Sequence, residues 1–460
     1  MDFCYLLIKI AMKLTNLIIL SMAMKASRLM VNEDIPDEVI CYNMFPRLPF
    51  KLVTSLKTMS KYYRTQLTGN TKFASIQATH CPSCPALIYI GCSNEEPYMY
   101  CLDVITSTPN IVGVPSSGLD FLGCPIDKGS FRLLASSNGL LCICYTSFRI
   151  GPLTPPPIIF IANPATQLAQ PIPGAPQHLV KNGVRIGVVG LVFDPLDDPL
   201  AKKKFMIVQA QPFASSNDTL TKFCFVTFSS DAGRWVMSDT FINKNIKQVR
   251  PSKVVYASGI LYWDCQEDLL WYDVTRGITG STKMPWKVQE SNSEEWERHT
   301  IDASNNGMLM CTTIDKNGLV MHQLVTIGDH YWELKHQKGW KDIAEMGGGA
   351  FQFCHSMKLR NGWQAKFCER WFVQPLGIES GRCLGVQLKW KIADKILRYD
   401  IATGKMDDIG KEFGNPWGMY YVLGYRNRMA ALPPINVPIL QDGICDGKFH
   451  GCICAIEGNK

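Results

Sequence analysis

The sequence predicts an α+β, multidomain chain in which a small helical unit precedes a large all-β, propeller-like domain. Two observations predict it. From Met1 to about Phe73 apolar residues recur with helical spacing, whereas from about Pro85 to about Leu440 short β-like runs alternate with Gly, Pro, Asn and Asp. The β region contains no amphipathic helical pattern of useful length. This disfavours a parallel α/β sheet and favours a sandwich, barrel or propeller.

Composition excludes several classes of protein. The chain has 460 residues, 46% hydrophobic and 19% charged, which suffices for one large domain or two to three ordinary ones and is not typical of a disordered chain. The net charge of +7 is dispersed, and its longest basic run is only 202–204, so no nucleic-acid surface is indicated. The eighteen cysteines lie mostly in apolar runs such as "LLCICY" (140–145), which predicts buried free thiols in a reducing compartment.

The first 31 residues form an apolar extension whose role stays open. The segment "CYLLIKIAMKLTNLIILSMAM" (4–24) resembles a signal or an anchor, yet Lys9 and Lys13 break it into runs too short for a clean membrane span. Three interpretations follow: an extension without a targeting role, a membrane-associated segment, or a secretion signal. The last of these conflicts with a reducing compartment.

One phrase recurs in the β region as a small polar turn ending in Gly, followed at once by an apolar strand. The copies are "ASSNGLLCICY" (135–145), "YASGILYWDC" (256–265) and "ASNNGMLMCTT" (303–313). A hairpin turn of this kind needs a positive φ, which glycine adopts without steric cost. We therefore predict positive φ at Gly139, Gly259 and Gly307.

A second phrase alternates with the first. An alternating strand reaches Asn, Ser or Asp and turns through Thr, Ala or Gly, in "IFIANPATQLAQPIP" (159–173), "CFVTFSSDAGRWVMS" (224–238), "LLWYDVTRG" (269–277) and "ILRYDIATGKMDDIG" (396–410). Asx and Ser side chains bond their own backbone two residues on and so fix such turns. Each phrase predicts a β-hairpin, and two phrases predict one four-stranded blade. The irregular spacing predicts degenerate blades with long inserted loops, and "ALIYIGCSNEEPYMYCLDV" (86–104) predicts a further early hairpin.

The helical unit begins at about residue 32. Pro36 suits the first helical position, Asp37 and Glu38 complement the helix dipole, and Pro46 ends the helix. After a turn at 47–49, the segment 50–67 carries one apolar stripe, and Ser60 is placed to cap a third helix. About 40 residues of helix cannot form a stable core alone, so this unit needs a partner surface.

This stretch, "IPDEVICYNMFPRLPFKLVTSLKTMSKYYRTQLTGNTKF" (35–73), resembles the F-box, whose pattern runs Leu-Pro-Asp-Glu, an apolar helix, Arg-Leu-Pro, then Lys, apolar positions and Ser-Lys-x-Trp-Arg. Tyr63 occupies the Trp position, Pro46 precedes Arg47, and "CYN" (41–43) is more polar than usual. The remainder resembles the F-box-associated domain of plant F-box proteins, in which "SSNGLLCI", "NPATQ", "FDP", "GILYW" and "YDIATGK" recur in this order. The resulting division is an extension (1–31), an F-box (32–75), a propeller-like domain (76–440) and a tail (441–460).

The resemblance implies a non-catalytic substrate receptor of an SCF-type ubiquitin ligase, cytoplasmic or nuclear unless the apolar extension directs it elsewhere. The F-box would dock on a Skp-family adaptor, which bridges to cullin, while the β domain binds a target protein for ubiquitination. Membrane and nucleic-acid partners are not expected. The implied adaptor-facing or adaptor-supporting residues are Ile35, Pro36, Val39, Ile40, Leu48, Pro49, Leu56, Met59 and Tyr63.

No catalytic residue, cofactor or metal ligand is predicted. "SSDAGRW" (229–235) is interpreted as a hairpin turn capped by Trp235, "CPSC" (81–84) lacks a second ligand pair, and "EMGGGAFQF" (345–353) lacks the Lys-Ser/Thr of a phosphate loop. Two alternatives stay open. The chain could be a propeller-fold binding protein acting outside a ligase, or an exported propeller glycosidase or lyase with a glycan at Asn217.

Overall fold

The computed structural model places two compact units, Met1–Ser83 with Arg428–Ala431 and Cys84–Asn427 with Leu432–Lys460. Each unit is considered by itself. The residues that the structure describes are 37–48, 53, 56, 61–67, 70, 72–73, 76–77, 84–93, 96–103, 118–124, 129–147, 157–175, 188–193, 204–214, 221–243, 254–265, 267–285, 298–304, 307–314, 318–339, 342–343, 372–379, 383–390, 393–408, 423–427 and 432–436.

The first unit is helical. Its elements are α2 (Asp37–Val39), the π-helix η1 (Ile40–Met44), the 3-10 helix η2 (Phe45–Arg47) and α4 (Lys61–Leu67). The expected continuous first helix is therefore three short consecutive pieces. The Phe45 N–H donates to the Ile40 carbonyl, five residues back, and Leu48 leaves the helix with an extended ψ of 144°. Pro46 lacks the N–H that an α-helix would use there, so the last turn tightens to 3-10.

The third predicted helix coincides with α4, which carries Tyr63 and Leu67, whereas its predicted cap Ser60 lies outside the described residues. These elements do not reproduce a set of three helices, and the three-helix F-box stays a prediction. Among the described helices none is long and apolar enough to span a membrane. The apolar extension 1–31 lies outside the described residues.

In the second unit the described strands form six antiparallel sheets, five with four strands and one with three. Blade 1 is β3 (Gly129–Ser137), β4 (Leu140–Ser147), β5 (Ile158–Asn163) and β6 (Leu168–Ile172). Blade 2 is β7 (Val188–Phe193), β8 (Phe205–Ala214), β9 (Thr221–Ser229) and β10 (Arg234–Asn243). Blade 3 is β11 (Val254–Ala257), β12 (Ile260–Cys265), β13 (Asp268–Asp273) and β14 (Thr279–Lys283).

Blade 4 is β15 (Arg298–Ala303), β16 (Leu309–Ile314), β17 (Gly318–Thr326) and β18 (Tyr331–Gly339). Blade 5 is β19 (Phe372–Glu379), β20 (Cys383–Trp390), β21 (Ala393–Asp400) and β22 (Met406–Asp408). The closing blade is β23 (Leu423–Asn427), β1 (Cys84–Ser93) and β2 (Glu96–Asp103), and a short 3-10 helix, η3 (Asp120–Leu122), precedes blade 1. The prediction of a large, all-β, propeller-like domain is confirmed.

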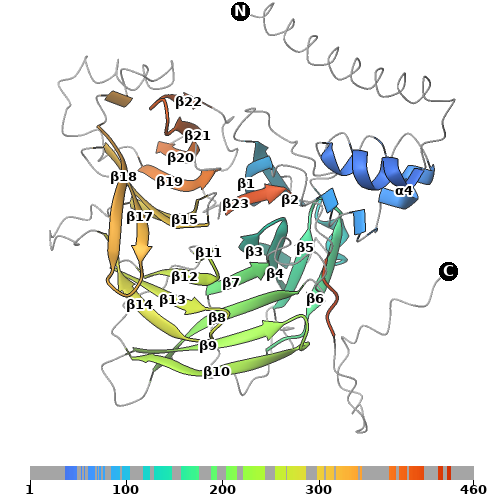
Figure 1. Ribbon diagram of the computed structural model, residues 1–460, viewed down its shortest axis with the longest axis horizontal. Helices are drawn as coiled ribbons and strands as arrows, with labels where there is room; N and C mark the ends of the chain where they lie inside the picture. The colour runs from blue at the N-terminus through green and yellow to red at the C-terminus, as the bar shows by residue number, and fades with distance from the viewer. Residues whose placement is uncertain are drawn as a thin grey trace, which may run out of the picture. The chain divides into compact units, whose positions relative to one another are not determined.

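The first strand of each blade contacts the first strand of the next, which closes the ring (Figure 1). The contacts run from β3 through β7, β11, β15 and β19 to β23, and β23 contacts β3. The closing blade joins the two ends of the unit, because β23 pairs with β1 over Cys84↔Asn427 to Ile88↔Leu423. The early hairpin predicted at 86–104 is β1 and β2, which pair from Ala86↔Asp103 to Ser93↔Glu96. Closure of this kind removes the free edges of the inner strands.

The first recurring phrase forms the turn between strands one and two of a blade. Asn138 and Gly139 have φ of 45° and 96°, and Ser258 and Gly259 have 47° and 82°. Two consecutive positive φ values are typical of a type I′ hairpin. Gly307 has φ of 77°. The predicted positive φ at all three glycines is confirmed.

The second recurring phrase forms the turn between strands three and four. Backbone N–H groups donate to the Oδ1 atoms of Asn163, Asp273 and Asp400 at 2.8–2.9 Å. The N–H donated by Thr403 lowers the pKa of the Asp400 carboxyl below its ordinary value. These are the predicted Asx turns, and two phrases do make one four-stranded blade. Because the strands alternate in direction, both kinds of turn lie at one end of the blades, which we name the turn end.

The core lies between neighbouring blades, and period-2 alternation supplies both of its sides. In β12, Leu261 and Trp263 pack in the cluster shared with blade 2, whereas Tyr262 between them packs in the cluster shared with blade 4. Strands buried on both faces read as continuous apolar runs. Because a buried free cysteine behaves as a small apolar residue, cysteines can occupy many positions in these runs.

The cysteines whose side chains the structure describes are all free thiols: Cys41, Cys124, Cys142, Cys144, Cys224, Cys265 and Cys311. Burial raises the thiol pKa of Cys142, Cys144 and Cys224, and raises that of the half-buried Cys124 to about 11. The prediction of buried free cysteine is confirmed for all of these residues except Cys124, which is free but only half-buried.

Alkylation of Cys124 in the folded chain is expected to rise about tenfold per pH unit from pH 8 to pH 10 without levelling off, because only the thiolate reacts and its pKa is about 11. Iodoacetamide labelling followed by peptide mass spectrometry measures this rate. In a denatured control the same peptide should level off above its ordinary pKa of about 8.5. A plateau in the folded chain below pH 10 would contradict the burial of this thiol.

Candidate docking surfaces

The predicted adaptor-binding residues differ in exposure. Val39 is 39% exposed, whereas Ile40, Leu48, Leu56 and Tyr63 are half-buried. Ile35, Pro36, Pro49 and Met59 lie outside the described residues, so no contact is assigned to them.

Two further apolar side chains, outside the predicted adaptor-binding set, are exposed. Met44 is 54% exposed and Tyr62 is 43% exposed. In a regular α-helix, residues 39 and 44 would point in different directions. The π-helix spans Ile40–Met44 with Val39 as its N-cap, and its bonds close between residues five apart, as from Phe45 to Ile40. From this spacing we infer that Val39 and Met44 lie about one turn apart, on one side of the segment. The two residues therefore form an apolar pair that an α-helical reading of the sequence does not give.

Tyr63 supports this helical segment from α4. Its ring meets that of Phe45 edge to face at 5.1 Å between centroids, and it meets the ring of Tyr62 at 5.6 Å. Edge-to-face aromatic pairs are a favoured geometry. Through this contact with Phe45, Tyr63 joins α4 to η2.

In the "CYN" segment (41–43), Cys41 and Tyr42 are less exposed to solvent than the polar sequence suggests. Cys41 is only 2% exposed, and the Tyr42 hydroxyl accepts a hydrogen bond from Asn70 Nδ2 at 2.9 Å. Asn70 Oδ1 in turn accepts from the Phe73 N–H at 3.0 Å, as an N-cap residue does, and Lys72 Nζ lies 4.5 Å from the Tyr42 ring centroid. Asn70 was missed, although an Asn three residues before an apolar position is a recognisable cap signal.

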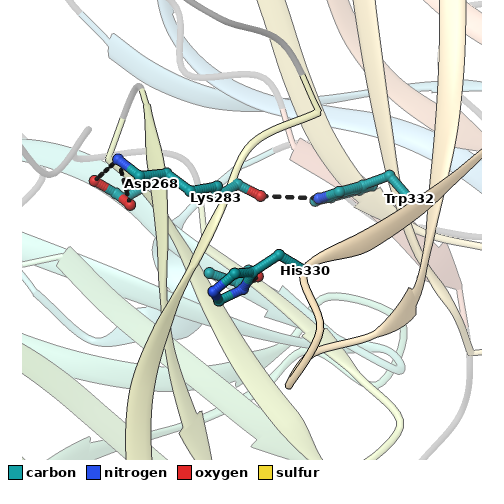
Figure 2. Close-up of polar contacts among 5 residues, drawn as sticks. Asp268, Lys283, His330 and Trp332 are labelled. Carbon is teal, nitrogen blue, oxygen red and sulfur yellow. Dashed lines mark hydrogen bonds and ion pairs between the residues drawn. The ribbon is translucent and has the colours of Figure 1, made fainter.

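Figure 2 shows polar contacts within blade 3 and between blades 3 and 4. Lys283 Nζ lies 3.2 Å from both carboxylate oxygens of Asp268, and Trp332 Nε1 donates to the Lys283 carbonyl at 2.8 Å. His330, which has a left-handed φ of 54°, contacts the Thr282 hydroxyl through Nδ1. The β17–β18 turn is thereby held against β14.

The same tryptophan contact occurs between blades 1 and 2. Trp235 Nε1 donates to the Pro173 carbonyl at 2.6 Å, and its ring packs at 5.3 Å from that of Phe228. Each of these two tryptophans lies near the start of the fourth strand of its blade. Trp235 donates to the carbonyl of the residue just after the fourth strand of the preceding blade, and Trp332 donates to the carbonyl of the last residue of that strand in its own preceding blade. The interpretation of "SSDAGRW" as a turn capped by Trp235 is confirmed.

A buried acid–imidazole pair joins blades 3 and 4 closer to the centre. His299 Nε2 lies 2.9 Å from Asp264 Oδ1 and 2.8 Å from Oδ2, and the two side chains are 3% and 0% exposed. A pair sealed from solvent cannot meet a substrate, so its geometry assigns it to holding the blades together.

The described part of the chain offers no metal chemistry, since no three His, Cys, Asp or Glu side chains in it converge on a possible ion site. Of the other motifs singled out in the sequence, Cys84 of "CPSC" begins β1 and Lys204 of "KKK" is exposed. Residues 81–83, 202–203, Asn217 and 345–353 lie outside the described residues.

Comparison with known proteins identifies a sequence family. The model of the family described as "F-box protein At3g26010-like, beta-propeller" matches residues 113–351, more than half of the 460 residues. A search of curated proteins found no match.

Similar solved structures are distant. A protein from Lactobacillus plantarum is 12% identical over 75% of this chain and 99% of its own, with a TM-score of 0.37. The GH74 xyloglucanase from Xanthomonas campestris is 8% identical over 75% of this chain and 54% of its own, with a TM-score of 0.34. The Dos1 propeller is 10% identical over 73% of this chain and 70% of its own, with a TM-score of 0.28.

Proposed function

Because the chain belongs to the family of F-box protein At3g26010-like β-propellers, we propose that it is a non-catalytic substrate receptor of an SCF-type ubiquitin ligase. The helical unit docks on a Skp-family adaptor, which bridges to cullin, and the propeller-like unit holds a target protein. The receptor itself forms no covalent bond. Its contribution is proximity, because a held target presents its lysines at a high local concentration to the ubiquitin-charged enzyme.

The observation that carries the proposal is the apolar pair of Val39 and Met44, 39% and 54% exposed on one side of the helical segment. Single exposed apolar residues are common on protein surfaces. Two aligned ones, backed by the Phe45–Tyr63 ring contact, make a compact anchor of the kind that dominates interface energetics. They also lie within the stretch that resembles an F-box.

Replacing Val39 and Met44 together by lysine is expected to reduce recovery of the adaptor at least about tenfold, because buried interface anchors each contribute about 2 kcal/mol or more. Co-purification of tagged full-length chain with the adaptor, scored by quantitative mass spectrometry, measures this. The matched control is Ile278→Lys with Val325→Lys, two apolar residues of the β unit that are 44% and 42% exposed. Equal adaptor recovery from the wild type and from V39K/M44K would refute the docking assignment.

The same purification separates the alternatives. Adaptor with cullin supports the ligase role, whereas adaptor without cullin indicates a binding protein acting outside a ligase. An exported enzyme would lack the first 30 or so residues when mature and would carry a glycan at Asn217, so its N-terminal peptide and its mass distinguish it. We expect the intact chain in the cytoplasm or nucleus.

A further inference from the structure

An extended segment after the last blade strand lies across blades 1 and 2 at the turn end. We name this segment, Leu432–Asn436, the strap; it is the red segment beside β6 in Figure 1. Gln170 Nε2 on β6 donates to the Pro433 carbonyl at 2.7 Å, and Pro433 is buried. The strap has no strand of its own and lies outside the blade sheets.

The other end of the strap is held by the β9–β10 turn. The Asn436 N–H donates to the Ser230 carbonyl at 2.9 Å, and Asn436 Nδ2 lies 3.2 Å from the Asp231 carbonyl oxygen and 3.4 Å from Asp231 Oδ1. An asparagine side chain whose NH₂ group meets both a backbone carbonyl and a carboxylate is recognised specifically, because few other side chains present such donors there. Between its two ends the strap needs only apolar residues that keep its backbone extended.

The receiving surface is built independently of the strap. Ser230 is 1% exposed, and its backbone N–H and its hydroxyl both bond the Phe205 backbone at 3.0 Å. The Asp231 N–H donates to Ser229 Oγ at 3.3 Å, and Trp235 fixes the start of β10 through the Pro173 carbonyl. The acceptors that face Asn436 therefore belong to a turn that the blades themselves hold in place, as preorganised peptide sites require.

We propose that the surface formed by Gln170, Ser230 and Asp231 binds peptides. The strap occupies this surface in cis, and when the strap is released an extended Pro-Pro-Ile-Asn-like segment of a partner protein can bind in its place. Proline favours the extended conformation and lowers the entropic cost of binding, and the Asn provides the specific contact. The tethered strap competes at a high effective concentration and so suppresses binding in trans until it is released. This surface is in the β unit, and the inference holds whether or not the helical unit docks an adaptor.

The test uses full-length chain and a fluorescent peptide with the sequence of residues 430–438, followed by anisotropy. Asn436→Pro removes both the N–H and the side-chain amide of the strap, so this variant is expected to bind the peptide at least tenfold more tightly than the wild type. Adding Gln170→Ala should weaken that binding about fivefold, as expected for the loss of one hydrogen bond, while Gln337→Ala on β18 should not. A peptide with Ala in place of Asn436 should bind the released chain more weakly.

A second measurement does not depend on any variant. Excess peptide added to the wild-type chain is expected to displace the strap and to accelerate hydrogen exchange of the Asn436 amide, which donates to the Ser230 carbonyl, while leaving β9 unchanged. A folded Asn436→Pro chain that binds the peptide no better than the wild type would overturn the proposal. If that variant unfolds, unchanged strap exchange under saturating peptide overturns it instead and leaves the strap a purely structural element.

Discussion

Replacing His299 by alanine is expected to lower the free energy of unfolding by about 3–5 kcal/mol, which is the cost of leaving a buried carboxylate without the side chain that contacts it. His299 Nε2 contacts both carboxylate oxygens of Asp264, at 2.9 and 2.8 Å, and the carboxylate is 0% exposed. Alanine would leave this group in the interior without the imidazole, and water cannot reach it. Urea unfolding followed by tryptophan fluorescence measures the change.

A matched control separates this effect from the loss of any histidine. His330→Asn alters an exposed histidine whose left-handed φ of 54° asparagine tolerates, and it should cost no more than about 1 kcal/mol. The double variant Asp264→Ala with His299→Ala removes the buried charge as well, and it should be less destabilised than the sum of the single variants. Additive single effects would show that the two side chains do not act as a pair.

Gly318→Ala is expected to destabilise the chain by about 3 kcal/mol through a clash that packing cannot relieve. Gly318 begins β17 with φ of 155°, and a Cβ placed there would lie 2.0 Å from the Lys338 carbonyl oxygen on β18. That atom belongs to the backbone of the paired strand, so the two strands would have to separate at Gly318↔Gly339. The midpoint of urea unfolding measures the loss.

Gly328→Ala in the same hairpin is the control. Nothing lies within 4 Å of a Cβ at Gly328, which is exposed in the β17–β18 turn, so its effect should stay within about 0.5 kcal/mol. Equal midpoints for G318A and wild type would mean that the first residue of β17 does not approach β18 as closely as the structure has it.

Much of the β unit follows from local residues. The turn residues at Gly139, Gly259 and Gly307, and the Asx turns of the second phrase, place hairpins because each depends on a few neighbouring atoms. The grouping of two phrases into one blade follows from their order along the chain. These elements depend on the chemistry of neighbouring residues, which can be identified in the sequence itself.

What could not be predicted depends on distant or irregular contacts. The pairing of β23 with β1 joins residues more than 300 positions apart, and no local pattern announces it. The cross-blade partners of Trp235, Trp332 and His299 are likewise set by assembly. In the helical unit Met44 was not among the predicted adaptor-binding residues, and an α-helical period does not place it beside Val39.

The closing blade imposes an order on the making of this protein. Strands β1 and β2 leave the ribosome early, but β23, the partner of β1 in the ring, follows only after all five four-stranded blades. During that interval the edge of β1 has no strand beside it on that side, and open strand edges invite wrong pairing. A nascent or truncated chain that ends before residue 423 therefore keeps an open strand edge on β1, which closes only once β23 has been made.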